Sequence, residues 1–248
     1  FAALPSTELL APINRALLPA YSSIANDRGS LGREYLSVLS VVTLIGIPAV
    51  VGLAATAPLF IPVVLGPNWL GAIPVLQILA FMGATNIISA NVYPAYLAMG
   101  RPDIAMKLGL FAATLSIALM LLLVPHYGLI GAASASLATS LIIVPVSVTV
   151  LMRMLDVHPG AIVRAVWRAF TAAAIMYACV MVFVRQFPLE PGILANLARL
   201  AMSVALGVVA YAGAVVLLWL ACGRPYGGET MLWAKGIELL RRARAGPD

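Results

Sequence analysis

The stretch LSVLSVVTLIGIPAVVGLAATAPLFIPVVL, residues 36–65, contains no charged side chain. Wound as a helix at about 1.5 Å per residue, a run of this length is longer than the roughly 30 Å hydrocarbon core of a bilayer. Its apolar character is continuous, whereas a membrane barrel strand would alternate over about ten residues. The stretch therefore predicts a membrane-spanning α-helix.

Similar apolar runs, bounded by charge, Gly or Pro, recur along the chain and predict an all-α, polytopic transmembrane bundle of about seven spans. They form a transmembrane domain over residues 1–222, followed by a basic tail at 223–248. The predicted spans are about 4–25, 36–65, 72–99, 103–124, 128–152, 163–185 and 193–222.

The composition excludes a water-soluble enzyme. Hydrophobic residues make up 62% of the 248 residues and charged residues only 10%, with a mean hydropathy of +1.03, so the chain cannot cover a soluble domain with polar surface. The net charge of +6 follows the connections between runs, which does not indicate nucleic-acid binding. Cys179 and Cys222 lie in apolar runs and are interpreted as small hydrophobic residues rather than as a disulfide or a metal site.

Basic residues gather in alternate connections. Twelve of the fifteen occur on one side of the predicted membrane, and the connections on the other side hold only Arg185. Because Lys and Arg are enriched in cytoplasmic loops, we expect a cytoplasmic C-terminus in the cell inner membrane and residue 1 on the outer side. This placement predicts an earlier span, and hence the C-terminal part of a longer transporter-like protein. The twelve residues are Arg28, Arg33, Arg101, Lys107, Arg153, Arg164, Arg168, Arg224, Lys235, Arg241, Arg242 and Arg244.

The first run, 4–25, has a polar face. At 100° per residue, Glu8, Arg15 and Ser22 fall within about 40° of one another, and Pro12 and Pro19 lie beside them. A cation near the middle of a span costs about 2.5–3.5 kcal/mol on insertion scales. Arg15 is therefore expected to face a water-filled cavity, with Glu8 and Ser22 as neighbouring candidates for substrate binding. The alternative is that Arg15 pairs with an acid elsewhere in the protein.

The run 72–99 carries polar groups on two sides. Gln77 and Asn91 share one side of the helical wheel, and Asn86 and Tyr93 share the opposite one. Gln77 and Asn91 are candidate cavity residues for substrate. We expect Asn86 and Tyr93 to hold helices together through hydrogen bonds.

No sequence motif predicts catalysis, a cofactor or a metal. The chain contains no P-loop, no HExxH, no GxSxG and no His/Cys ligand cluster, so we expect a protein that is not an enzyme and needs no cofactor. The tail is expected to form a short amphipathic helix whose basic side binds anionic lipid of the inner leaflet.

Several motifs together resemble a known family. The stretch LPSTELLAPINRALLPAYSSIANDRGSLGREYL at residues 4–36, GPNW at 66–69 and YLAMGRP at 96–102 are similar to Wzx-type, WzxC-like polysaccharide flippases of the multidrug/oligosaccharidyl-lipid/polysaccharide exporter superfamily. The resemblance covers residues 4–155 well and places the chain as the C-terminal half of such a protein.

The resemblance implies two helical lobes around a central cavity, of which this chain would supply one lobe and additional C-terminal helices. It also implies alternating access and an undecaprenyl-diphosphate-linked oligosaccharide as substrate, for which the guanidinium of Arg15 would be suited because it binds diphosphate bidentately. The partners would be this lipid-linked substrate, membrane lipids and the N-terminal half of the same protein. Two alternatives remain open: a cation-coupled small-molecule antiporter, and a membrane-embedded glycosyltransferase or acyltransferase.

Overall fold

The computed structural model describes residues 11–187 and 192–222. Glu8 and the predicted tail lie outside the described residues. All regular elements of the described part are helices, which satisfy their backbone hydrogen bonds within one segment as a span requires. In chain order they are α2 (Ala11–Ile24), α3 (Arg28–Val64), the short 3₁₀ helix η1 (Pro67–Ala72), α4 (Ile73–Ser89), α5 (Val92–Ala98), α6 (Pro102–Met154), α7 (Pro159–Gln186) and α8 (Ile193–Ala221).

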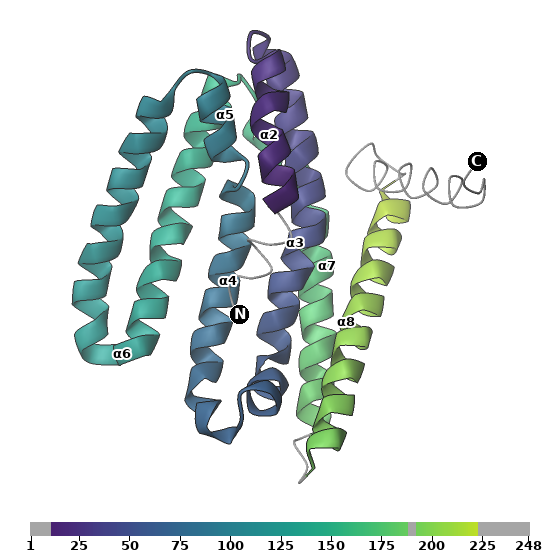
Figure 1. Cartoon of the computed structure of the whole chain (residues 1–248). Coiled ribbons are helices and arrows are strands. Elements are labelled where there is room, and N and C mark those ends of the chain that lie inside the picture. Colours follow the sequence, from purple (N-terminus) through teal and green to yellow (C-terminus); the bar gives the residue numbers. More distant parts are fainter. Residues whose placement is uncertain (1–10, 188–191, 223–248) are drawn as a thin grey trace, which may run out of the picture.

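Helix α3 lies at the centre of the bundle, with α4, α7 and α8 packed along it (Figure 1). More than half of its most hydrophobic window is buried inside the protein. Val50 of α3, Ile87 of α4 and Met176 of α7 belong to one buried cluster. A Cβ atom added to Gly46 would lie only 2.9 Å from Ile87 Cδ1, so glycine at this position allows α3 and α4 to approach closely.

Helix α6 folds back on itself. Gly128 interrupts it with φ 55° and ψ −130°, a left-handed conformation that glycine adopts without strain. The two arms then run in opposite directions (Figure 1). None of the most hydrophobic window of α6 is buried, and it exposes large apolar side chains such as Leu121 and Leu129, as expected of a surface that faces lipid.

Five helices of the described part are long and apolar enough to cross a membrane, against seven predicted runs. The runs 103–124 and 128–152 both fall within α6, because the chain folds back there at Gly128. Only residues 11–24 of the first run are described as a helix. The all-helical membrane class is confirmed, and the count of seven stays a prediction.

The run 72–99 is a broken helix. Helix α4 ends at Ser89 and α5 begins at Val92, so Asn91 lies in the break. Pro94 has no amide hydrogen and cannot bond the carbonyl of Ala90 four residues before it. The break therefore leaves backbone groups at this level of the bundle that need other partners.

One end of the bundle collects the basic residues. The α2–α3, α5–α6 and α6–α7 connections lie together at this end, which is the upper end in Figure 1. Six of the twelve basic residues lie in or near these connections with exposed side chains. They are Arg28, Arg33, Arg101, Lys107, Arg153 and Arg164.

Candidate functional site

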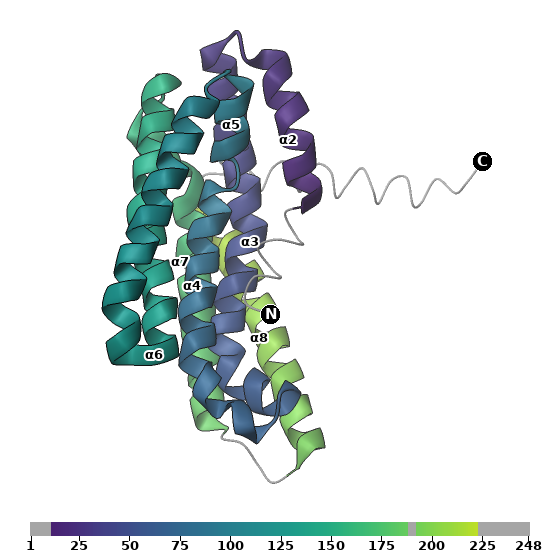
Figure 2. The same cartoon turned by 60° about the vertical axis from the view of Figure 1, so that its left-hand side comes forward.

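Helix α2 lies on the outside of the bundle beside α3 and α5 (Figure 2). Leu17 and Tyr21 are buried on its inner face, while Pro19 and Ser22 are exposed. By helical register, position 15 falls between the directions of Pro19 and Ser22 rather than that of Tyr21. The structure thus places Pro19 and Ser22, the part of the predicted polar stripe that it describes, on the face turned away from the bundle. The side chain of Arg15 and the whole of Glu8 lie outside the described residues.

Gln77 links α4 to α3. Its Nε2 donates a hydrogen bond of 3.2 Å to the carbonyl oxygen of Ala54. Pro58 lies four residues after Ala54 in α3 and has no amide hydrogen, so this carbonyl lacks its helical donor. The side chain of Gln77 is half-buried and takes the place of that donor. This contact supports a role in helix packing for Gln77, and its prediction as a substrate residue is untested.

Asn91 is fully buried, with no exposed surface. Neither its Oδ1 nor its Nδ2 has a hydrogen-bond partner among the described residues. It stands at the break between α4 and α5. The sequence predicts a side chain facing a cavity, whereas in this conformation the amide is enclosed.

In the 72–99 run, Asn86 and Tyr93 do not lie at the contacts between helices where we expected them. Both side chains are exposed, Tyr93 at 60%, so they do not hold helices of the described bundle together. Gln77 and Asn91 lie on the inner side instead. Because the run is strongly apolar all round, its sequence does not indicate which polar side faces inward.

Tyr211 of α8 is a residue that the sequence reasoning missed. Its hydroxyl donates a hydrogen bond of 2.7 Å to the carbonyl oxygen of Leu44 in α3. Pro48, four residues after Leu44, leaves that carbonyl without its helical donor. The sequence shows a tyrosine in one apolar run and a proline in another. It does not indicate that the tyrosine lies beside the carbonyl that the proline leaves without a donor.

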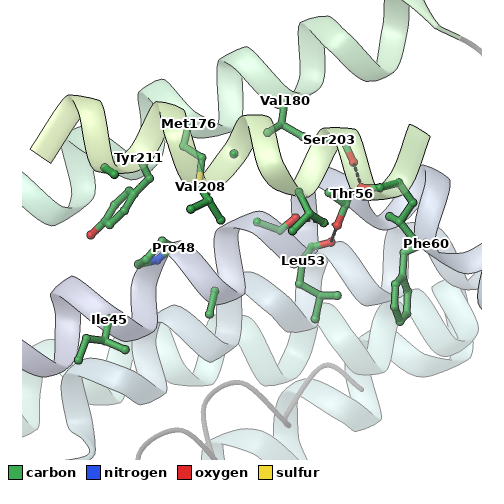
Figure 3. Close-up of a pocket in the computed structure, with 16 residues that line it drawn as sticks. Ile45, Pro48, Leu53, Thr56, Phe60, Met176, Val180, Ser203, Val208 and Tyr211 are labelled. Carbon is green, nitrogen blue, oxygen red and sulfur yellow. Dashed lines mark hydrogen bonds between the residues drawn. The ribbon is translucent and has the colours of Figure 1, made fainter. Parts of the chain in front are cut away.

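An apolar groove lies between α3, α7 and α8 (Figure 3). It encloses about 620 Å³. The hydroxyls of Thr56 and Ser203 donate to carbonyls of their own helices, Gly52 at 2.9 Å and Leu200 at 2.8 Å, so their donors are already used. The groove therefore offers an almost entirely apolar surface. Its lining includes Ile45, Pro48, Leu53, Phe60, Met176, Val180, Val208 and Tyr211.

Arg168 is buried in α7, with 5% of its surface exposed. The prediction that Arg168 lies in the connection before this helix is wrong, because α7 already begins at Pro159. Arg168 stands in the third turn of α7, and it has an interaction partner. Burial of a guanidinium requires such a partner, because an unpaired charge in an apolar interior is very unfavourable.

The basic end of the bundle also carries two helix caps. Asp27 accepts a hydrogen bond of 3.0 Å from the backbone N–H of Gly29 at the start of α3. The Ser30 hydroxyl also donates to this carboxylate and is the main reason why the pKa of Asp27 is lowered. At the start of α7, His158 Nδ1 accepts a bond of 3.1 Å from Gly160 N–H. These contacts fix the first turns of α3 and α7.

Comparison with known proteins gives partial matches. A family model described as polysaccharide biosynthesis protein matches residues 1–74. The chain is 34% identical over 116 residues to the lipopolysaccharide biosynthesis protein WzxC of Escherichia coli K12, which covers 47% of this chain and 24% of that protein. It is 27% identical over 129 residues to an uncharacterized membrane protein in the cps region of Klebsiella pneumoniae, covering 52% of this chain and 27% of that protein.

A third relative is the teichuronic acid biosynthesis protein TuaB of Bacillus subtilis 168, 27% identical over 93 residues, or 38% of this chain and 19% of that protein. The matched segments thus span less than a third of the length of each relative. The position of the chain within a longer protein stays a prediction. The resemblance itself is confirmed at this level: the chain is a helical, multi-pass membrane protein that is similar, over part of its length, to polysaccharide biosynthesis proteins.

Proposed function

We propose that the protein acts in polysaccharide biosynthesis by moving lipid-linked oligosaccharide units from the inner to the outer face of the cytoplasmic membrane through alternating access. The observation that supports this most directly is the presence of two surfaces of opposite polarity in one bundle. The groove between α3, α7 and α8 is apolar, and the outer face of α2 is polar at Ser22. A substrate with an isoprenoid tail and a polar head needs both.

In this proposal the outer face of α2 lines a central cavity that another segment of the same protein completes. Arg15 binds the diphosphate or an acidic sugar, because guanidinium stays charged and offers paired donors. Glu8 and Ser22 extend the same stripe. Gln77 and Asn91 are the other candidate residues for substrate binding. Gln77 would contribute by holding α4 against α3.

The basic end of the bundle is proposed to face the cytoplasm, since Lys and Arg are retained on that side. Anionic lipids of the inner leaflet are the expected partners of this end and of the tail. Transport of this kind needs no covalent chemistry, so the protein is proposed to be a transporter rather than an enzyme.

Replacement of Arg15 tests the proposal. In a bacterium that depends on the full-length protein for polymer export, Arg15→Ala should abolish export and cause lipid-linked oligosaccharide to accumulate on the inner face, and Arg15→Lys should restore only part of the activity. Arg153→Ala, which removes an exposed cation from the basic end, serves as the matched control. Normal export by Arg15→Ala at normal membrane levels would exclude a binding role for Arg15.

Reconstitution tests the transport activity itself. Vesicles containing the purified full-length protein should move a fluorescent lipid-linked oligosaccharide between leaflets. Failure of the wild-type protein to do so, or consumption of a glycosyl or acyl donor by it, would contradict the proposed function.

A further inference from the structure

Three buried polar side chains lie on segments that pack together where α2 covers the bundle. Tyr21 of α2, Tyr35 of α3 and Asn91 at the α4–α5 break have no exposed surface. The two tyrosine hydroxyls, Asn91 Oδ1 and Asn91 Nδ2 all lack a hydrogen-bond partner among the described residues. Buried polar groups in native proteins are nearly always bonded, so such a concentration requires an explanation.

These side chains occupy one region of the structure. Tyr21 and Tyr35 belong to the same buried cluster, together with Ala95 and Tyr96 of α5. Asn91 is one helical turn before Ala95, on the same side of the chain, and α2 packs on α5.

The neighbouring Tyr96 provides an internal comparison. It is equally large and almost fully buried, but its hydroxyl donates to the carbonyl oxygen of Ser147 at 2.7 Å. Tyr96 therefore has a structural partner in α6. Tyr21, Tyr35 and Asn91 have no such partner in the described bundle. Hydrogen bonds among the three residues therefore do not explain why they are buried.

The chemistry of the three residues indicates which ligand they fit. An amide presents one donor group and one acceptor, and a phenol is both donor and acceptor. An alkali cation would satisfy the oxygen atoms but leave Asn91 Nδ2 without an acceptor, and an anion would leave Oδ1 without a donor. A hydroxyl group donates one hydrogen bond and accepts up to two, so hydroxyl groups supply both the donor that Oδ1 needs and the acceptor that Nδ2 needs. Sugars carry many such groups, and aromatic side chains pack well against their apolar C–H faces.

We propose that Tyr21, Tyr35 and Asn91 form a binding site for saccharide hydroxyl groups, which α2 closes in the conformation described here. The inference rests on the proposed function and adds the residues that contact the sugar. Helix α2 is suited to uncover the site because it lies at the edge of the bundle (Figure 2), and its described side chains contact the interior at Leu17, Tyr21 and Ile24. The closed conformation leaves these polar groups without hydrogen bonds. It is therefore less stable than an interface in which every polar group is bonded.

This arrangement predicts that stability and transport change in opposite directions. Asn91→Leu keeps a similar volume and removes the unbonded amide, so the full-length protein in detergent should unfold at a higher temperature. Transport of the lipid-linked oligosaccharide in vesicles should fall roughly tenfold or more, because the amide loses its hydrogen bonds to the sugar. Tyr21→Phe and Tyr35→Phe should behave in the same way.

Tyr96→Phe is the matched control. It removes a hydroxyl that is already bonded to Ser147, so it should lower the unfolding temperature and reduce transport no more than its loss of stability explains. If Asn91→Leu raises stability and transports at the wild-type rate, the buried groups hold only internal water and the proposal is wrong. A lower unfolding temperature for Asn91→Leu would equally contradict it, because the amide would then be structural.

Accessibility provides a second measurement that does not depend on transport. In a variant whose two cysteines are replaced, Cys179→Ala and Cys222→Ala, a cysteine in place of Asn91 should react with a hydrophilic maleimide when α2 opens, and added lipid-linked oligosaccharide should slow the reaction. Arg101, exposed in the α5–α6 connection, gives the control position, where a cysteine should react whether or not the site opens. Wild-type protein that moves no lipid-linked oligosaccharide would refute the proposed function, whereas normal transport with an unreactive position 91 would refute this inference alone.

Discussion

Gln77 Nε2 lies 3.2 Å from the carbonyl oxygen of Ala54 and donates a hydrogen bond to it across the α3–α4 interface. That carbonyl has no helical donor because Pro58 stands four residues later. Two helices are thus joined at the point where one of them is interrupted. The pair of Tyr211 and Leu44 repeats this arrangement between α8 and α3 at Pro48.

Removal of the Gln77 donor should destabilise the bundle unless the proline is removed as well. Gln77→Leu leaves the Ala54 carbonyl without a partner and should lower the free energy of unfolding by about 1–3 kcal/mol. In the Pro58→Ala background, a backbone N–H can bond Ala54, so Gln77→Leu should cost much less. Unfolding of the four proteins in detergent measures this coupling. Equal costs in both backgrounds would show that Gln77 acts in another way.

The turn of α6 should tolerate no side chain at Gly131. A Cβ at this position would lie 2.4 Å from the carbonyl oxygen of Leu123, so the backbone of the two arms would have to move. We expect Gly131→Ala to destabilise the protein by about 1–3 kcal/mol. Gly109→Ala in the same helix meets nothing within 4 Å and should be neutral or slightly stabilising. The order of the two unfolding temperatures tests the prediction, and a reversed order would contradict the fold-back of α6.

The cap of α3 should make stability depend on pH in the acidic range. The Ser30 hydroxyl, first among several hydrogen bonds, lowers the pKa of Asp27. A lowered carboxyl pKa stabilises the folded state above the unfolded value of about 3.9, and this contribution is lost as the pH falls through the folded pKa. The difference in unfolding temperature between wild type and Asp27→Ala should therefore be greatest near neutral pH and shrink below about pH 4.

Asp27→Asn separates the charge from the cap. An asparagine side chain still accepts the Gly29 N–H but does not titrate, so this variant should remain capped across the same pH range. If wild type and Asp27→Asn show the same pH dependence, another group is responsible for it.

Filling the apolar groove should impair transport without unfolding the protein. Gly52 lines the groove, and an added Cβ would meet only Met176 Cε at 3.7 Å. Gly52→Leu should occupy part of the volume of about 620 Å³ and lower the transport rate on the order of tenfold, as expected for steric competition in an apolar site. Gly109→Leu, on the exposed surface of α6, is the control. Unchanged transport by a folded Gly52→Leu protein would show that the groove does not hold the lipid tail.

The sequence predicted several features of the fold because their causes are local. Apolar runs longer than a bilayer is thick must be helical in lipid, and the runs 36–65, 163–185 and 193–222 overlap helices α3, α7 and α8. The sequence also predicts a polar stripe on the first helix, since Arg15 and Ser22 lie seven residues apart and therefore on one face; the structure describes the Ser22 side of it as exposed. The broken helix at Asn91 was not predicted, although Pro94 was a signal for it.

Only the tertiary structure decided which polar groups meet. Gln77 and Ala54 are 23 residues apart, and Tyr211 and Leu44 are 167 apart. No periodicity connects them, because helices that are apolar on all sides give no local indication of which face turns to which neighbour. For the same reason the burial of Asn91 and Arg168, against the exposure of Asn86 and Tyr93, follows from packing alone. The sequence by itself determined that the chain is a helical membrane protein. The packing of the helices determined which carbonyl groups opposite prolines receive a hydrogen bond and which polar side chains are enclosed.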